Sequence, residues 1–290
     1  MGGSTGRTAP HEARVAAFWD RYTGQARSAP AFLAGHPLVV ARAAADVRRL
    51  PEVAAPDVRG AGAGAAYLRD VLHRRRHGLS LRTTGAAVLE LPGRPGDVLV
   101  GSSRATLRRK VRAAERRGLA CRPVTDPGER EALLARAHAA EAEHPDPRYR
   151  VSAPDNSDLL AFGHWYVTED ADGRALHLAV VPVAGEWAAL RYFRTLSWGE
   201  AESDARYLAS AHLAAALVAT GVRHVLDPEP PGTQGPGLRH FQRMVGYRYV
   251  RLVAAAQEAA SPVRRRVAVG ALSLAAAAAG VSLEAEWLLG

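Results

Sequence analysis

The most concentrated charge in the chain lies at residues 102–119, SSRATLRRKVRAAERRGL, where seven cations accompany a single glutamate, Glu115. Helical spacing puts Leu107, Val111 and Ala114 on one face and spreads the cations over the rest. A solvated helix usually mixes acids and bases at i,i+4 spacing, whereas guanidinium groups suit phosphate oxygens. The excess predicts contact with a polyanion; the alternative is the wet face of a helix in an arginine-rich chain. The cations are Arg104, Arg108, Arg109, Lys110, Arg112, Arg116 and Arg117.

Polar residues that could move a proton or hold a carbonyl group occur later in the chain. Asp227 and Glu229 follow a strand pattern at 222–226, and a carboxylate at a strand end beside a cleft can act as a general base. The alternative role is a loop salt bridge or a turn cap. His240 falls in a short helical pattern, where it is either an acid or base or a surface or packing residue. The candidate catalytic residues are Asp227, Glu229, His240 and Gln242.

A second group of residues could bind a substrate. The pattern at 186–197 is typical of a strand, and its alternation predicts that Arg191 shares one side with Phe193, while Tyr192 and Arg194 share the other. Which side faces a cleft is left open by the pattern. The candidate substrate-binding residues are Arg191, Tyr192, Arg194, Trp165, Tyr207 and Arg239.

Metal and redox chemistry have no support in the spacing of the residues. The eleven histidines show no ligand spacing, and the single cysteine, Cys121, excludes an internal disulfide and a multi-cysteine metal site. We therefore expect no metal and no cofactor, and a reducing, cytoplasmic environment. The alanine-rich stretch 267–283 is shorter and less apolar than a membrane span requires. It predicts a packed helix, with an interfacial helix as the alternative.

The elements that must position these residues become regular from residue 102. Ser102 or Ser103 could cap the basic helix, Asp126 the next one and Ser203 a long one at 203–220. Before residue 100, helical patterns at 12–22 and 65–77 and a strand pattern at 86–91 stand among Pro- and Gly-rich breaks. After the basic helix, helices are predicted at 127–143, 155–163, 203–220 and 236–245, and strands at 119–125, 164–169, 174–183, 186–197, 222–226 and 247–253.

The order of these elements resembles the GCN5-related N-acetyltransferase superfamily, as does the phrase PGLRHFQRMVGYRY at 236–249. The segments LRRKVRAAERRGL and DARYLASAHLAAALVATGVRHVLD resemble the branch that includes the Fem-type aminoacyl-tRNA-dependent peptide transferases. This resemblance implies an α/β (α+β) fold with a mixed, mostly antiparallel central sheet that opens into a V-shaped cleft between flanking helices. It also implies a reduced N-terminal lobe at 1–100 and a transferase domain at 101–260. The alanine-rich composition predicts a third part, a helix at 261–290.

The donor is the point on which the resemblance can be sharpened. Acyl-CoA enzymes of this superfamily hold a pyrophosphate on a glycine-rich loop at the start of the long helix, where N–H groups and the helix dipole attract anions. The stretch here, WGEAESDAR at 198–206, has one glycine and three acids instead. Fem-type enzymes carry a lysine after the phenylalanine that corresponds to Phe241, where this chain has Gln242, so Arg239 or Arg243 would have to supply the charge.

These features predict an amide-forming aminoacyltransferase. Its donor would be the acceptor end of an aminoacyl-tRNA, bound by the basic helix, and its acceptor a small peptide or amine in a natural-product or cell-wall pathway. The net charge of +9 agrees with a polyanionic partner, and we expect neither DNA nor a membrane as partner. The alternatives are an acyl-CoA-dependent N-acyltransferase and a non-catalytic member of the fold that binds RNA or a peptide.

Overall fold

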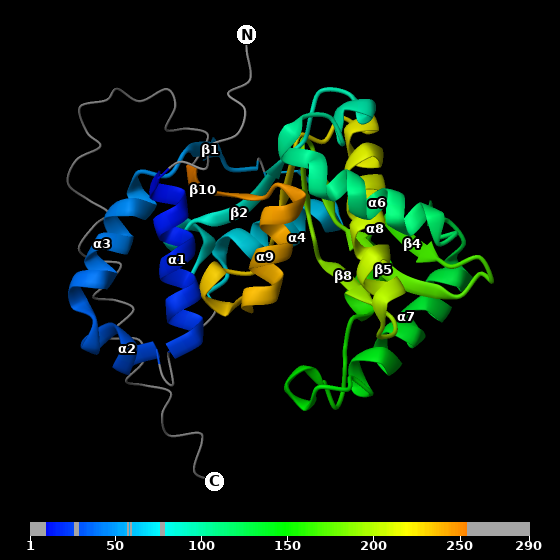
Figure 1. Ribbon diagram of the computed structural model, residues 1–290, viewed down its shortest axis with the longest axis horizontal. Helices are drawn as coiled ribbons and strands as arrows, with labels where there is room; N and C mark the ends of the chain where they lie inside the picture. The colour runs from blue at the N-terminus through cyan, green and yellow to red at the C-terminus, as the bar shows by residue number, and fades with distance from the viewer. Residues whose placement is uncertain (1–9, 26–28, 57, 59, 76–78, 254–290) are drawn as a thin grey trace.

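The computed structural model describes residues 10–25, 29–56, 58, 60–75 and 79–253. Two mostly antiparallel sheets lie at its centre, and helices flank both of them (Figure 1). The predicted mixed α/β class, with a mostly antiparallel sheet between helices, is confirmed. The predicted alanine-rich helix at 261–290 lies outside the described residues.

The larger sheet has six strands and joins early and late parts of the chain. Its parallel pairs are β1 with β10 and β7 with β9, and its other pairs are antiparallel. Because β2 pairs with both β10 and β9, this sheet runs across the domain boundary expected at residue 100. In spatial order the strands are β1 (Glu52–Ala54), β10 (Arg248–Val253), β2 (Ala86–Glu90), β9 (His224–Leu226), β7 (Trp187–Ala189) and β6 (Val183–Ala184).

The smaller sheet has four antiparallel strands, which are β3 (Ala120–Pro123), β4 (His164–Glu169), β5 (Ala175–Val181) and β8 (Tyr192–Thr195). Helix α7 (Pro127–Ala142) packs on one face through Leu133, Leu134 and Ala137. Helix α8 (Glu200–Ala219) covers the other face and touches all four strands. β5 is buried along its whole length, as expected of a strand between two helical layers.

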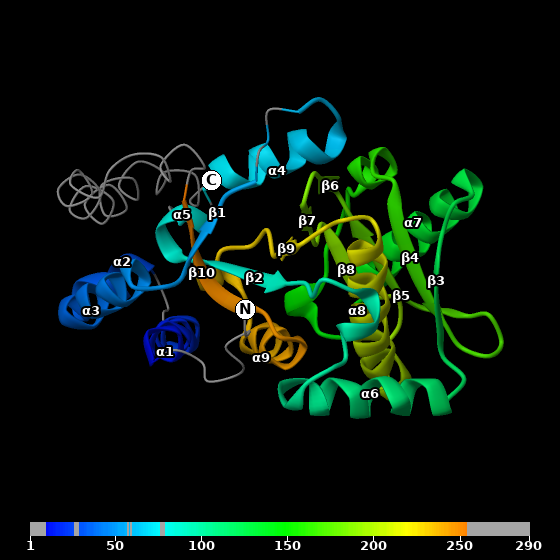
Figure 2. The ribbon, with the colours of Figure 1, turned by 90° about the horizontal axis from the view of Figure 1, so that it is seen from above.

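The basic segment forms helix α6 (Ala105–Arg116), which packs across α8 at a steep angle (Figure 2). The predicted apolar face is confirmed, because Leu107, Val111 and Ala114 are buried. The predicted serine cap is wrong: a short 3₁₀ turn over Ser102–Arg104 precedes α6, and Arg104 occupies the cap position.

The caps of the other helices follow local chemistry. The Asp126 carboxylate accepts the Glu129 N–H at 2.7 Å at the start of α7, as predicted. Helix α8 begins at Glu200 after Gly199, three residues earlier than predicted, so Ser203 lies inside the helix and does not cap it. Helix α9 (Pro236–Val245) has the predicted bounds and ends at Gly246, whose φ of 96° is left-handed.

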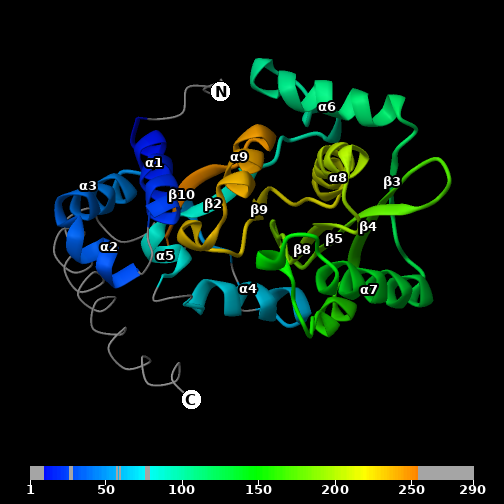
Figure 3. The same ribbon diagram turned by 60° about the horizontal axis from the view of Figure 1, so that its bottom comes forward.

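The N-terminal helices gather at one end of the molecule, beside β10 and β2 (Figure 3). Glu12 of α1 accepts the Tyr249 N–H of β10 at 3.1 Å, and Asp20 pairs with Arg239 of α9 at 2.8 Å. These helices are α1 (Pro10–Gln25), α2 (Ala29–Gly35), α3 (Pro37–Arg48) and α5 (Leu81–Thr84). Helix α4 (Ala63–His73) instead extends toward the middle of the molecule, where it contacts β6 and β7 (Figure 3). Further short 3₁₀ turns cover Pro95–Asp97, Pro147–Tyr149, Ser157–Ala161 and Pro231–Thr233.

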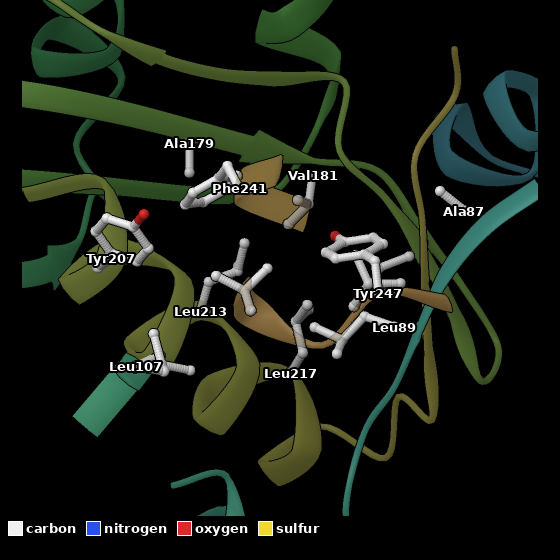
Figure 4. Packing of buried hydrophobic residues seen from close by; sticks show 14 of the residues in the cluster. Ala87, Leu89, Leu107, Ala179, Val181, Tyr207, Leu213, Leu217, Phe241 and Tyr247 are labelled. Atoms are coloured by element: carbon white, nitrogen blue, oxygen red, sulfur yellow. The ribbon is translucent and has the colours of Figure 1, made fainter. Parts of the chain in front are cut away.

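The main hydrophobic core lies between α8, α9 and the two sheets. Phe241 of α9 lies in it beside Tyr207 of α8 and below Ala179 of β5, and Tyr247 fills the space between Val181 and Leu89 (Figure 4). Phe241 is therefore the side chain through which α9 contacts both α8 and the smaller sheet.

We predict that Gly64→Ala destabilises the protein. Gly64 lies in helix α4, where replacing glycine by alanine normally raises the free energy of unfolding by about 1 kcal/mol. A Cβ atom at Gly64 would overlap the backbone carbonyl of Val183 in β6. Because backbone cannot move aside like a side-chain tip, we expect a loss of about 1–3 kcal/mol in the free energy of unfolding, measured by urea titration.

Gly237→Ala in helix α9 is the matched control, because a Cβ there meets nothing within 4 Å. We expect this variant to be neutral or slightly stabilised. Equal behaviour of the two variants would contradict the close contact between α4 and β6.

Candidate active site at the fork between β8 and β9

A single stretch of chain belongs to both sheets and opens a fork between them. β7 pairs in parallel with β9 up to Ala189 and Leu226, and the Leu190 N–H still donates to the Leu226 carbonyl at 2.9 Å. The next N–H group, that of Arg191, donates a hydrogen bond to the Ala189 carbonyl of the same strand segment at 3.0 Å. β8 then continues beside β5 and not beside β9. The two neighbouring strands therefore part at residues 190–191.

The fork leaves one edge of β8 without a strand partner in the described structure. The Leu196 N–H donates to Leu176 of β5 at 2.8 Å. Because successive N–H groups of a strand alternate between its two edges, those of Phe193 and Thr195 point toward the unpaired edge. Two backbone donors are therefore directed at the opening of the fork.

The break in the strand also changes where the side chains lie. Arg191 donates to Asp158 at 2.8 and 2.7 Å and to Asn156 at 3.3 Å. Arg194 pairs with Glu141 of α7 at 3.3 Å, and Glu141 also accepts from Asn156. The predicted placement of Arg191 opposite Arg194 is thus wrong, because the turn at 190–191 interrupts the pleat. Tyr192 and Arg194 do share one side, as predicted, and Tyr192 is buried there against α7. Both arginines belong to one polar network on the α7 side.

Asp227 is the first residue after β9, at the vertex of the fork, since Leu226 is the last β9 residue paired with β7. Its carboxylate accepts the Glu229 N–H at 2.8 Å and the side-chain amide of Gln242. Burial raises the pKa of Asp227 to about 7. A carboxylate with this pKa exchanges a proton near neutral pH, as a general base requires.

The other three predicted catalytic residues lie in different surroundings. Gln242 is buried and uses its amide group on Asp227, while His240 is exposed on α9. Glu229 is half-buried and accepts from the Thr233 hydroxyl at 3.3 Å. The structure therefore brings Asp227, Glu229 and Gln242 together and leaves His240 apart.

Three predicted substrate-binding residues are packed within the protein. Arg239 is 1% exposed and donates to Asp20, Thr23 and backbone carbonyls at 231 and 234. The Trp165 indole is 1% exposed and donates to the Phe162 carbonyl at 2.9 Å. Tyr207 is buried against Phe241, with ring centroids 5.2 Å apart. Among these three residues, only Tyr207 packs against Phe241, whose ring lies 5.9 Å from that of Phe193 in β8.

The acids at the start of α8 are neutralised from within the protein. Asp204 pairs with Lys110 of α6 and with Arg117, the C-cap residue of α6, each at 3.2 Å, and Glu200 pairs with Arg117 at 2.8 Å. The buried Glu202 carboxylate accepts from the Ser197 hydroxyl at 2.6 Å and lies over Gly199, the N-cap position. The chain's own carboxylate therefore occupies the place where this helix would attract an anion.

The seven cations of the basic helix divide into two groups. Arg104 donates to the Val245 carbonyl at the end of α9, and Arg108 donates to the carbonyls of Leu99 and Gly101 at 2.6 Å. Lys110 and Arg117 bind the α8 acids described above. Arg109, Arg112 and Arg116 are exposed and form neither a hydrogen bond nor an ion pair within the described part of the chain. The outer face of α6 thus presents three unpaired guanidinium groups.

Several residues of this region carry no signal that sequence patterns could reveal. The backbone amides of Phe193 and Thr195 matter only through the pairing of β8, and Glu141 and Asn156 lie on segments that look like ordinary helices. Arg206 of α8 also escapes notice as one arginine in a helical pattern, although its guanidinium lies 4.4 Å from the Phe241 ring centroid.

A small cavity lies on the helical side of the fork. Its volume is about 30 Å³, and residues lining it include Leu190, Phe193, Val225 and Phe241. No group of three or more metal-ligating side chains comes together, and no helix is long and apolar enough to cross a membrane, in the described ranges.

Comparison with known proteins gives partial matches to solved structures. No protein-family model and no curated protein matches the chain. The C-terminal domain (DUF2156) of a protein named as a lysylphosphatidylglycerol synthetase from Agrobacterium fabrum has 17% identity and a TM-score of 0.42, over 57% of this chain and 58% of the other. The structure of L-PGS from Bacillus licheniformis has 14% identity and a TM-score of 0.41, over 60% and 62%. The chain thus covers less than two thirds of either structure, and membership of the acetyltransferase superfamily stays a prediction.

We predict that Asp227 makes the stability of the protein fall as pH rises from about 4 to about 7. The folded pKa of about 7 exceeds the ordinary value of 3.8, so the native state holds the proton more tightly than the unfolded chain. The loss of unfolding free energy that comes from ionising Asp227 is absent below about pH 4 and complete above about pH 7. At about 1.4 kcal/mol per tenfold difference in affinity, it reaches about 4 kcal/mol.

Denaturant titrations of the wild type and Asp227→Asn at pH 4, 5.5 and 8 test this expectation. The variant should gain stability relative to the wild type as pH rises, and a constant difference would show that Asp227 has no raised pKa. Glu229→Gln serves as the control for removing a neighbouring carboxylate.

Proposed function

We propose that the protein transfers an amino acid from an aminoacyl-tRNA to the amine of a small peptide or other small molecule. The observation that carries the choice of donor is the buried Glu202 carboxylate over the start of α8. A pyrophosphate held there would meet a like charge and would have to displace an internal hydrogen bond. A donor that carries its phosphates elsewhere, on the face of α6, avoids this conflict.

The fork supplies the groups that amide formation needs. The acceptor amine attacks the carbonyl carbon of the aminoacyl ester, and the carbonyl oxygen becomes an oxyanion. The Phe193 and Thr195 N–H groups on the unpaired edge of β8 are the donors that we assign to this oxyanion. The ester C–O bond then breaks, the amide bond remains, and the terminal ribose oxygen leaves as a hydroxyl that takes up the proton removed from the amine by the base.

Asp227 is the base that we assign to the amine proton. It lies at the vertex of the fork, and its pKa of about 7 lets it accept a proton at neutral pH. Gln242 donates to it and so holds the carboxylate in place. In this arrangement Gln242 positions the base and does not take over the carbonyl-binding role of the lysine in Fem-type enzymes.

The donor is tested by incubating the protein with a mixture of radiolabelled aminoacyl-tRNAs and a small-metabolite extract. We expect a labelled small product that disappears when RNase is added first. Parallel arms contain labelled acetyl-CoA, or vesicles of phosphatidylglycerol as acceptor, since the name of one compared structure specifies that lipid. Labelling from acetyl-CoA that ignores RNase would overturn the proposal, and RNA binding without any product would indicate a non-catalytic protein.

Changing Arg109, Arg112 and Arg116 together to Glu should weaken tRNA binding by at least about 100-fold at low salt, because three phosphate contacts become repulsive. The salt dependence of the dissociation constant should become shallower as well. Filter binding over a range of salt concentrations measures both effects.

Arg42, Arg48 and Arg82 changed to Glu form a control with the same change in net charge, since these side chains are also exposed and lie on α3 and α5. Equal loss of affinity in both triple variants would show that net charge, and not the face of α6, governs binding.

Asp227→Asn should lower kcat by about 10²–10⁴-fold, because the variant removes the proposed base while keeping its shape. In the wild type kcat should rise as pH increases through about 7, the pKa of the buried carboxyl. Stopped-point assays of the single transfer product between pH 5.5 and 8.5 check both statements. A wild-type rate independent of pH across this window would remove Asp227 from the role of base.

A further inference from the structure

Arg206 stands out as a partly buried cation without a counter-ion. Its Nε is buried and has no hydrogen-bond partner, and within the described residues the side chain forms no ion pair. Burial lowers the pKa of this guanidinium. Leaving a charge in such a position costs free energy unless a partner arrives.

The neighbours of Arg206 are aromatic. Its Cζ atom lies 4.4 Å from the ring centroid of Phe241 and 6.0 Å from that of Tyr207. Phe241 in turn lies 5.9 Å from Phe193, whose amide points to the unpaired edge of β8. The guanidinium thus lies over a ring that packs against the side chain of Phe193, whose amide is one of the two proposed oxyanion donors.

His177 is a further polar group near this cation, and it cannot act as the missing counter-ion. Its ring is fully buried 4.3 Å from that of Phe193, and neither nitrogen has a partner. Burial, together with the nearby Arg206 charge, lowers the pKa of His177 to about 3. The imidazole is therefore neutral and cannot offset a positive charge.

A continuous path links Arg206 to the basic helix. The Lys110 Nζ lies 5.7 Å from the centroid of the Tyr207 ring, on which Arg206 also borders. Lys110 is on α6, the helix that presents the unpaired Arg109, Arg112 and Arg116. Cations and buried aromatic rings thus extend from the contact between α6 and α8 toward the fork.

We propose that Arg206 binds the last phosphodiester of the tRNA acceptor strand and so fixes the terminal nucleoside beside the edge of β8. This inference rests on the proposed function and specifies where its donor enters. The proposed anion site at Arg206 then lies about one helical turn farther along α8 than Glu202, whose carboxylate lies over the start of this helix. Arg206 is a binding residue here, and the rings of Phe241 and Tyr207 hold it in position.

The test compares wild type and Arg206→Met with two acceptor minihelix RNAs, one native and one with an uncharged methylphosphonate at its last linkage. For the wild type we expect the dissociation constant to rise about 10- to 100-fold on neutralising that linkage. For Arg206→Met, both RNAs should bind equally weakly. Arg206→Lys, which keeps the charge without the planar fork, should give an intermediate effect.

Independent losses from the two changes would overturn the contact between Arg206 and this phosphate. The contact is also excluded if Arg206→Met leaves RNA affinity intact and raises only the KM of the acceptor, which would assign Arg206 to an acceptor carboxylate. If the wild type binds neither RNA, the proposed tRNA donor falls, and this inference falls with it.

Thermal melting without RNA separates binding from a structural role. An uncompensated cation does not stabilise the free protein, so Arg206→Met should melt at the same or a higher temperature than the wild type. A lower melting temperature with unchanged discrimination between the two RNAs would make Arg206 a packing residue only.

Discussion

The turn at Leu190 and Arg191 is the constraint on which the site depends. A strand can share its hydrogen bonds with only one neighbour on each edge. This stretch keeps β6 and then β5 on one edge, and it loses β9 from the other edge after Leu190. The change leaves β8 with free amides, puts Asp227 at the vertex and swings Arg191 onto the α7 side. It also makes room for Phe241, which fills the space where the two sheets separate.

Electrostatic pairing explains how such a basic helix can pack beside an acidic one. Lys110 and Arg117 of α6 meet Asp204 and Glu200 of α8, so the contact between these helices is held by opposite charges at their edge and by apolar side chains at its centre. These ion pairs neutralise part of the positive charge of α6, and the remaining unpaired cations lie on its outer face. The two groups have different consequences, because paired charges fix geometry while unpaired charges attract a partner.

The elements with strong local signals could be predicted from the sequence, and those defined by distant pairing could not. Pro236 and Gly246 delimit α9 correctly, and Asp126 caps α7, because each acts on its own neighbourhood. The break at 190–191 depends on two strands from other parts of the chain. A prediction that continued the strand alternation through the break therefore placed Arg191 on the wrong side of the sheet. The partners of Lys110 and Arg206 depend on the same kind of long-range packing, which no spacing rule encodes.

The salt bridge from Arg239 to Asp20 ties the beginning of the described chain to its end. Arg239 has no exposed side-chain surface, and α1 supplies both its carboxylate and a hydroxyl from Thr23. Glu12 of the same helix binds the backbone of β10. A fragment beginning near residue 100 would leave the Arg239 charge buried without a counter-ion and remove β2 from the middle of its sheet. Helix α1 therefore stabilises the α9–β10 segment. Shortening the chain from its N-terminal side would first disturb α9, which carries Phe241 and Gln242 at the fork.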